Sequence, residues 1–185
     1  TIYNIHMKVI TGKFGGRKLL DNKYEHIRPT ADMVKQAVFN KLVDRIIGAK
    51  VLDLFCGTGA LGIEAISRGA GEVIFVDKDK RSISLTEQNL KNLGIESRTI
   101  CQDYESALNL FVGQKFDIIL LDPPYKSGFY EKALKLIKDN NLLSDDGIVV
   151  CEHDRDITID FIGYELLDER KYGIKKVSYL RKIIN

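Results

Sequence analysis

Short apolar segments alternate with helix-favouring segments from Lys50 onward, and this order restricts the chain to few folds. An apolar strand followed by a helix, repeated along the chain, is typical of a mostly parallel sheet that helices cover on both faces. We therefore predict an α/β fold. The predicted strands are residues 51–55, 73–76, 98–101, 117–121 and 148–151, and the predicted helices are residues 60–67, 81–93, 104–111 and 129–138.

The C-terminal part of the chain does not continue this alternation. Two segments, residues 164–167 and 175–183, flank the turn-forming pair Tyr172-Gly173. Strands joined by a short glycine-containing turn pair in antiparallel fashion. We therefore expect this hairpin at the edge of the sheet, which would bring the sheet to seven strands.

The N-terminal part of the chain is predicted to form a small β-hairpin and a helix. Residues 8–10 and 17–20 flank Gly15-Gly16, which indicates two short strands joined by a turn. A helix is predicted from about residue 31 to residue 47, because Thr30 is a suitable N-terminal cap and apolar residues recur at helical spacing. The recurring apolar residues are Val34, Val38, Leu42 and Ile46.

Length and composition indicate one soluble domain. The chain has 185 residues, of which 44% are hydrophobic, enough for a single core. We place the domain at residues 7–185, with 7–49 as a basic hairpin and helix and 50–185 as the α/β core. Residues 1–6 are set apart as an addition before a natural start at Met7. Because no apolar run is long enough to span a bilayer, we expect a soluble cytoplasmic protein without membrane contact. We further expect it to be a monomer.

Cysteine and histidine residues show no metal-ligand spacing. The three cysteines are far apart in the sequence, and the three histidines form no ligand-like pattern with them. We predict no metal site and interpret the cysteines as buried free thiols. The residues concerned are Cys56, Cys101, Cys151, His6, His26 and His153.

Basic residues gather near the N-terminus, although the net charge of the whole chain is only +2. Residues 7–50 hold ten Lys or Arg against four Asp or Glu, a net charge of +6, whereas residues 51–150 carry −4. A basic segment beside a mildly acidic body suggests that a polyanion contacts one side of the protein. An ordinary solvated lysine-rich surface explains the same pattern equally well.

Residues 51–62, VLDLFCGTGALG, are predicted to form a buried strand, a glycine turn and the start of a helix. The pattern Gly57-x-Gly59-x-x-Gly62 also matches a dinucleotide fingerprint, so a nicotinamide oxidoreductase is one alternative. Asp53 argues against it, because a carboxylate at the end of this strand would repel a pyrophosphate. The same carboxylate suits the ammonium group of S-adenosylmethionine, which it can hold with a charge-assisted hydrogen bond.

Acidic residues after the next two strands fit the rest of this cofactor. Asp77 ends the second strand, where an acid accepts hydrogen bonds from both ribose hydroxyls in nucleotide-binding sheets. Asp103 follows the third strand, where it either reaches the adenine amino group or caps the next helix, and the two roles are compatible. The predicted cofactor-binding residues are Asp53, Phe55, Gly57, Thr58, Gly59, Asp77, Lys78, Asp103 and Tyr104.

The tetrapeptide Asp122-Pro123-Pro124-Tyr125 directly follows the apolar strand at residues 117–121. Ligands bind beyond the carboxyl ends of strands in open parallel sheets, so this segment should face the same crevice as the glycine turn. Asp122 and the carbonyl of Pro123 can accept the two hydrogens of an exocyclic amine, and Tyr125 can stack on a base. We predict these four residues as catalytic; a proline turn after a strand-ending acid is the structural alternative.

With both motifs in place, the chain from Met7 onward resembles the class I methyltransferases, and within them the RsmD-type bacterial 16S ribosomal RNA guanine-N2 methyltransferases. Gly15-Gly16-Arg17-Lys18-Leu19 and Arg28-Pro29-Thr30 are the more discriminating part of this likeness. The resemblance implies a Rossmann-like fold, S-adenosylmethionine as cofactor, and methylation of a guanine 2-amino group in the small ribosomal subunit or its assembly intermediate. It also implies an RNA contact at Arg28, and the predicted RNA-binding residues are Lys13, Arg17, Lys18, Lys23, Arg28 and Thr30.

The predicted reaction is a direct in-line displacement, in which guanine N2 attacks the sulfonium methyl group while Asp122 orients the amine. The base must leave its stack to reach the crevice, so an exposed RNA loop is the expected target. Many relatives in the wider class carry Asn in place of Asp122. These include DNA adenine-N6 and protein glutamine-N5 methyltransferases, which are the main alternatives. A noncatalytic ribosome-assembly factor on the same fold is a third.

Overall fold

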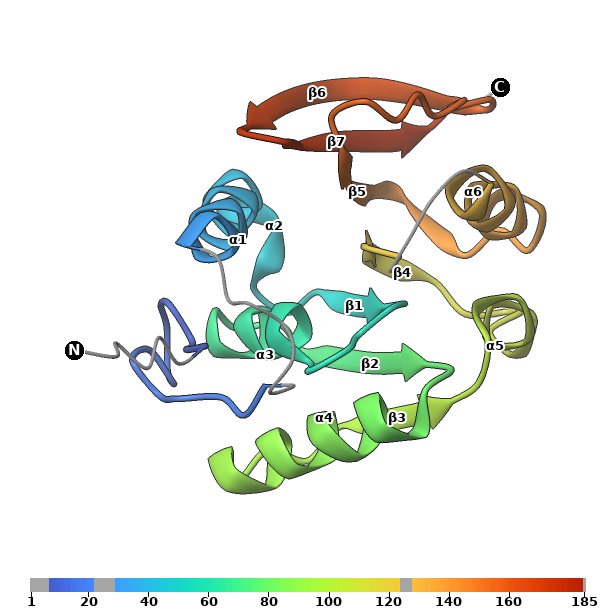
Figure 1. Cartoon of the computed structure of the whole chain (residues 1–185). Coiled ribbons are helices and arrows are strands. Elements are labelled where there is room, and N and C mark those ends of the chain that lie inside the picture. Colours follow the sequence, from blue (N-terminus) through green and yellow to red (C-terminus); the bar gives the residue numbers. More distant parts are fainter. Residues whose placement is uncertain (1–6, 22–28, 124–127, 185) are drawn as a thin grey trace.

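The protein is built on one seven-stranded sheet (Figure 1). The computed structural model describes residues 7–21, 29–123 and 128–184. The strands follow the order β3-β2-β1-β4-β5-β7-β6, in which the first five are parallel and β7 is antiparallel to both of its neighbours. Their bounds are β1 Lys50–Asp53, β2 Glu72–Asp77, β3 Arg98–Cys101, β4 Phe116–Leu121, β5 Leu143–Asp154, β6 Tyr164–Tyr172 and β7 Lys175–Lys182. The predicted parallel sheet with an antiparallel edge pair is confirmed.

Helices cover both faces of this sheet, as Figure 1 shows. Side chains alternate between the two faces, so Val51 enters one apolar core and Leu52 the other. The first core is closed by α1, α2, α3 and α4, and the second by α5 and α6. The helices are α1 Pro29–Lys41, α2 Val43–Ile46, α3 Ala60–Ser67, α4 Lys80–Leu93, α5 Tyr104–Leu110 and α6 Phe129–Asp139.

The predicted N-terminal helix is interrupted. It begins at Pro29 and pauses at Leu42, whose backbone leaves helical geometry, before α2 resumes at Val43. The four apolar residues at helical spacing are nevertheless all buried, because one irregular residue does not turn the row away from the sheet. Thr30 is the second residue of α1 and not the residue before it, so its prediction as the cap is wrong.

The predicted N-terminal strands are reduced to one isolated antiparallel bridge between Lys8 and Lys18. Backbone hydrogen bonds still join the two segments, from Val9 N–H to Arg17 at 2.9 Å and from Leu19 N–H to Met7 at 2.8 Å. Val9 and Leu19 are buried in the first core. The path of a hairpin is therefore as predicted. This N-terminal segment, residues 7–21, is also bound to α3 and α4, because the N–H of Ile10 donates to Glu64 at 2.8 Å and the N–H of Leu20 donates to Asn89 at 2.7 Å.

The cysteines are free thiols, as predicted, but only two of them are buried. Cys56 and Cys151 lie in the two cores, whereas Cys101 is exposed at the end of β3. Its burial was wrongly predicted because β3 lies at the edge of the sheet and is not covered there. In the part of the chain that the structure describes, no helix is both long and apolar enough to cross a membrane.

Candidate active site

Acidic residues collect at the carboxyl edge of the sheet. Strands β1, β2, β3 and β4 run parallel, so all of them end at the same edge. Asp53 and Asp77 are the last residues of β1 and β2, Asp103 follows β3, and Asp122 follows β4. The topology therefore brings to one edge four acids that follow four different strands of the sequence.

The glycine turn between β1 and α3 has one open side and one crowded side. Gly57 and Gly59 adopt positive φ values of 54° and 82°, which glycine tolerates best. A Cβ atom on Gly57 would meet nothing within 4 Å, so a ligand could approach the backbone there. A Cβ atom on Gly62 would lie 2.3 Å from the ring of Phe75, so Gly62 allows α3 to pack closely on β2. The turn is thus open toward the carboxyl edge and tightly packed beneath.

Asp53 lies beneath the glycine turn and is only 2% exposed. Its Oδ2 accepts a hydrogen bond of 3.0 Å from the N–H of Gly62. Burial raises the pKa of Asp53 to about 7; the Gly62 hydrogen bond opposes this rise, and the nearby charges of Asp122 and Asp77 add to it. A cationic ligand placed beside these carboxylates would relieve their repulsion.

Asp77, the last residue of β2, holds the glycine turn in place through hydrogen bonds. Its Oδ2 accepts from the N–H of Gly57 at 2.9 Å, and its Oδ1 accepts from the N–H of Asp79 at 2.9 Å. Each carboxylate oxygen can still accept a second hydrogen bond, so both remain able to receive hydroxyl donors. Asp79 caps α4 by accepting from the N–H of Arg81 at 2.9 Å, and the side chain of Lys78 is exposed.

Asp103 is a helix cap, one of the two roles that we predicted for it. Its carboxylate accepts from the N–H of Ser106 at 2.9 Å and from the hydroxyl of the same residue at 2.8 Å. These hydrogen bonds lower the pKa of Asp103. The side chain is exposed, so this role leaves it accessible from solvent.

Three aromatic rings cluster beside this edge. Phe55 after β1 and Tyr104 after β3 have ring centroids 5.5 Å apart. Phe129, the first residue of α6, lies 5.5 Å from Tyr104 and 6.3 Å from Phe55. Phe129 was not predicted as a site residue, although an aromatic residue directly after a glycine that follows the Asp-Pro-Pro-Tyr segment is a usable signal. The cluster gives the acidic edge an apolar wall.

The Asp-Pro-Pro-Tyr segment is described only in part. Asp122 is half-buried and Pro123 is buried, whereas Pro124 and Tyr125 lie outside the described residues. The charge of Asp122 contributes to the raised pKa of Asp53 on one side and of Glu152 on the other. Asp122 therefore occupies the middle of the acidic edge.

Glu152 is a further acid at this edge that the sequence analysis did not select. In the register of β4 and β5, Leu121 pairs with Cys151, so Glu152 is the next residue beyond that pair, as Asp122 is on β4. Burial raises the pKa of Glu152 to about 8, and Asp122 adds to this rise while Lys175 opposes it. Glu152 directly follows the predicted strand at residues 148–151, but no motif surrounds it that would indicate a chemical role.

The predicted RNA-binding residues that the structure describes lie away from the acidic edge. Lys13, Arg17 and Lys18 are exposed on the N-terminal segment. The N–H of Lys13 donates to Ser67 at the end of α3, and the Arg17 guanidinium donates to Asn92 near the end of α4. Both helices start at the carboxyl edge and run back, so these cations stand at the far end of the helices. Lys23, Arg28 and the side chain of Thr30 lie outside the described residues.

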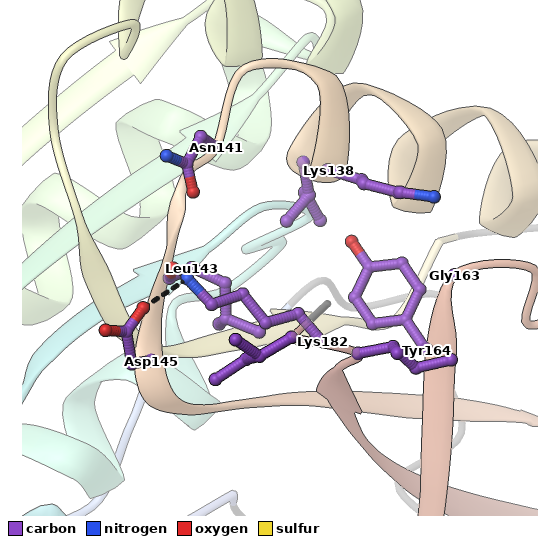
Figure 2. A pocket seen from close by; sticks show the side chains of 10 residues that line it. Lys138, Asn141, Leu143, Asp145, Gly163, Tyr164 and Lys182 are labelled. Carbon is purple, nitrogen blue, oxygen red and sulfur yellow. Dashed lines mark hydrogen bonds and ion pairs between the residues drawn. The ribbon is translucent and has the colours of Figure 1, made fainter.

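A cavity of about 250 Å³ occurs at the opposite edge of the sheet, between α6, the start of β5 and the β6–β7 pair (Figure 2). Its lining includes Tyr164, Lys138 and Lys182, and Lys182 forms an ion pair of 2.6 Å with Asp145. None of the predicted site residues lines it. This cavity is therefore separate from the acidic edge.

Comparisons with known proteins match nearly the whole chain. The family model described as Conserved hypothetical protein 95 matches residues 7–181. The Ribosomal RNA small subunit methyltransferase D of Haemophilus influenzae is 35% identical over 180 residues, covering 94% of this chain and 91% of that protein. YlbH of Bacillus subtilis is 38% identical over 182 residues, covering 95% and 99%. The solved structure of yhhF from Escherichia coli has a TM-score of 0.85 at 26% identity, covering 96% and 98%.

Proposed function

Because the chain belongs to the Conserved hypothetical protein 95 family and is an RsmD-type methyltransferase, we propose that it methylates the 2-amino group of a guanine in 16S ribosomal RNA. Its relatives in Haemophilus influenzae and Escherichia coli carry the name Ribosomal RNA small subunit methyltransferase D. That name supports ribosomal RNA of the small subunit as the substrate. The proposal goes beyond that name when it specifies guanine as the base and the 2-amino group as the methylated nitrogen.

The observation that carries the proposal is an open glycine turn that lies against two acids, the buried Asp53 and the half-buried Asp77. Asp53 is buried directly beneath the turn, and Asp77 holds the N–H of Gly57 from its other side. This combination fits S-adenosylmethionine, because its ammonium and sulfonium groups are positive and its ribose supplies two hydroxyl donors. A dinucleotide would bring a pyrophosphate to the same acids, where repulsion is expected.

The residues of this chain have separate tasks toward that cofactor, which supplies an electrophilic methyl group when bound. Asp53 attracts the positive end of the donor, and the free lone pairs of Asp77 accept the ribose hydroxyls. The ring cluster of Phe55, Tyr104 and Phe129 supplies apolar surface for a flat adenine ring. Together these groups fix the donor at the carboxyl edge.

Asp122 and the carbonyl of Pro123 prepare the amine of the target base. An exocyclic amine is a weak nucleophile because its lone pair is delocalised into the ring. Two acceptors that take its two hydrogens turn the lone pair toward the methyl group, and the carboxylate of Asp122 can receive the proton that is released. Positioning supplies the catalysis, so no covalent intermediate through Cys56 or Cys151 is required, and both thiols are buried.

The decisive experiment combines methyl transfer with nucleoside analysis. Purified protein and labelled S-adenosylmethionine are incubated with small ribosomal subunits from cells lacking this protein, with DNA, or with a glutamine-containing protein acceptor. Mass spectrometry of the digested products should find N2-methylguanosine in the ribosomal RNA. Label only in DNA adenine or only in protein glutamine would contradict the proposal. Tight binding of NADH in preference to S-adenosylhomocysteine by calorimetry would exclude the cofactor.

A variant tests whether the chain acts as an enzyme or only binds the ribosome. Asp122→Ala removes the predicted acceptor and should lower the rate of methyl transfer by about 100-fold or more. Binding of S-adenosylhomocysteine should be retained, because Asp53 and Asp77 are intact. Asp146→Ala removes an exposed acid at the opposite edge and is the matched control. Full activity of the Asp122→Ala variant would mean that another group holds the amine.

A further inference from the structure

Glu152 stands beside Asp122 at the carboxyl edge of the sheet. The register pairs Leu121 with Cys151, so both acids are the next residues on two hydrogen-bonded parallel strands, which are about 4.8 Å apart. Within β5, Glu152 lies on the same face as Val150, and its partner on β7 is Val177, which belongs to the same core as Val150. Its carboxylate therefore extends the acidic edge of Asp53 and Asp122 by one strand.

The carboxylate of Glu152 has no structural task that explains its position. Within residues 7–21, 29–123 and 128–184, no hydrogen bond or ion pair reaches its side chain, although the residue is half-buried. The neighbouring cation, Lys175, pairs with Asp154 at 2.8 Å instead. The hydroxyl of Tyr130 donates to the main-chain oxygen of Glu152 at 2.5 Å, which fixes the strand and leaves the carboxylate available. The charge of Lys175 offsets part of the cost of burying this acid, but a partly buried carboxylate that accepts no hydrogen bond remains costly unless a ligand donates one.

We propose that Glu152 selects guanine by accepting the N1–H of the base, while Asp122 and the carbonyl of Pro123 hold the adjacent 2-amino group. The proposal rests on the function proposed above and identifies the residue that distinguishes guanine from other bases. Guanine presents the N1–H donor directly beside its 2-amino donors, so two neighbouring carboxylates match this edge. Adenine presents an acceptor at N1, which a carboxylate would repel. Glu152 is thus a specificity residue and not a proton carrier for the transfer.

The electrostatics of the edge agree with this assignment. Burial and secondly the charge of Asp122 raise the pKa of Glu152, so its carboxyl holds a proton at neutral pH while no ligand is bound. Glu152 accepts the N1–H of guanine in its ionised form, and partners that donate hydrogen bonds or bring positive charge favour that form. Guanine brings such donors and the methyl donor brings such charge.

Nucleoside binding tests the proposal directly. Guanosine and 2-aminopurine riboside both carry the 2-amino group, but only guanosine has an N1–H. Each is titrated by NMR, at a pH above 8 where the Glu152 carboxyl is ionised, into protein saturated with S-adenosylhomocysteine. The wild type should bind guanosine at least about tenfold more tightly, because 2-aminopurine turns an acceptor toward the carboxylate. The Glu152→Gln variant offers an amide that can either accept from N1–H or donate to an N1 acceptor, so it should lose this preference, whereas Glu152→Asp should keep it.

Turnover provides the second readout. Glu152→Gln should lower the yield of N2-methylguanosine on small subunits by about 100-fold while binding of S-adenosylhomocysteine changes less than twofold. Glu165→Gln makes the same change at an exposed ion pair on β6 and should leave both unchanged. Equal binding of the two nucleosides by the wild type, or an unaltered preference in Glu152→Gln, would overturn the role of Glu152 alone. Absence of both guanosine binding and N2-methylguanosine with the wild type would remove the proposed function as well.

Discussion

The side-chain amide of Asn89 in α4 donates a hydrogen bond of 3.0 Å to the carbonyl oxygen of Thr58 in the glycine turn. The same amide also bonds both backbone groups of Leu20, accepting from its N–H at 2.7 Å and donating to its oxygen at 3.0 Å. Asn89 is 1% exposed, so these bonds are shielded from water. One buried side chain therefore ties the basic N-terminal segment to the turn at which we place the methyl donor.

Replacing Asn89 with Ala should destabilise the protein and weaken donor binding together. The change leaves the three backbone groups without their partner, at a cost of about 2 to 4 kcal/mol in the free energy of unfolding. The carbonyl of Thr58 loses its fixed position, so affinity for S-adenosylhomocysteine should also fall. Urea unfolding and calorimetry measure the two effects. Asn92→Ala, at an exposed position on the same helix, should change stability by less than about 0.5 kcal/mol.

Gly62 is expected to tolerate no side chain. The added Cβ of Gly62→Ala would meet the buried ring of Phe75 at 2.3 Å, so α3 must shift away from β2. The shift should cost about 1 to 3 kcal/mol and stretch the hydrogen bond from Gly62 to Asp53. Thermal unfolding and binding of S-adenosylhomocysteine should both report a loss.

Gly113 supplies the control for this change. It also has a positive φ, of 86°, but a Cβ atom there would meet nothing within 4 Å. Gly113→Ala should therefore show only the backbone cost, about 1 kcal/mol, with normal donor binding. Equal losses of donor binding in both variants would mean that crowding against Phe75 is not the cause.

The elements from β1 to α6 could be predicted because apolar spacing decides them. Every predicted strand and helix in this part ends within two residues of its observed bounds, since each buries an apolar row against the sheet. Strand β5 is longer than predicted at both ends. Its first half contains Asp145 and Gly147, which are typical of loops in a sequence. In the structure this half is nevertheless a strand that pairs with β4, and Asp145 forms an ion pair with Lys182.

Strand β6, at the edge of the sheet, was also predicted too short. Its second half, residues 168–172, is strongly charged, so alternation of apolar residues gave no signal. Ion pairs across the strands hold it instead, among them Lys176 with Glu169 at 3.2 Å. Charged side chains are common on edge strands because they discourage pairing with other chains. Such pairs depend on register, which the sequence alone does not define.

The candidate site was predictable where a strand-ending acid stands in a recognisable motif, and an acid without a motif was missed. Asp53, Asp77 and Asp122 stand at strand ends beside the glycine turn or in the Asp-Pro-Pro-Tyr segment, so the rule that ligands bind at the carboxyl edge selects them. Glu152 also follows a predicted strand, residues 148–151, but no motif surrounds it, and only the register of β5 with β4 brings it beside Asp122. Phe129 was missed because an aromatic residue at a helix start is usually attributed to the core.

Stability without a bound donor should fall as the pH rises from about 4 to 7. Asp53 keeps its proton in the folded protein up to about pH 7, whereas in the unfolded chain it releases the proton near its ordinary value of 3.8. The folded state therefore binds more protons across this window, and the free energy of unfolding decreases by up to a few kcal/mol as the pH rises through it. The raised pKa of Glu152 acts with the same sign up to about pH 8.

Urea unfolding at pH 5 to 8 checks this dependence. Asp53→Asn cannot ionise and should show a flatter profile, with greater stability than the wild type at pH 8. Asp168→Asn is the control: ion pairing with Lys41 and Arg170 lowers the pKa of Asp168 to about 2, outside this window. Its slope between pH 5 and 8 should equal that of the wild type. The lowered pKa of buried His153 acts with the opposite sign, so the comparison between variants decides: an Asp53→Asn profile with the same slope as the wild type would show that Asp53 is ionised in the folded protein.

The basic N-terminal segment should contribute to RNA binding without affecting the donor. Arg17 and Lys18 stand at the far end of α3 and α4 from the glycine turn, so their loss should leave the affinity for S-adenosylhomocysteine unchanged. If each contacts one phosphate, Arg17→Ala with Lys18→Ala should reduce the slope of log affinity against log salt by about 1.4 to 1.8. Binding to purified small subunits, measured at several salt concentrations, gives this slope.

The matched control removes the same charges from the opposite edge of the sheet. Arg181 and Lys171 are exposed on β7 and β6, and their joint replacement with Ala lowers the net charge by the same two units. If RNA binding depended only on the total charge of the protein, both double variants would show the same decrease in the slope of log affinity against log salt. If the N-terminal segment contacts phosphates, only the Arg17 and Lys18 double variant should reduce the slope. Counterions are released from RNA only where a cation of the protein contacts a phosphate. An unchanged slope in that pair would make the basic segment an ordinary solvated surface.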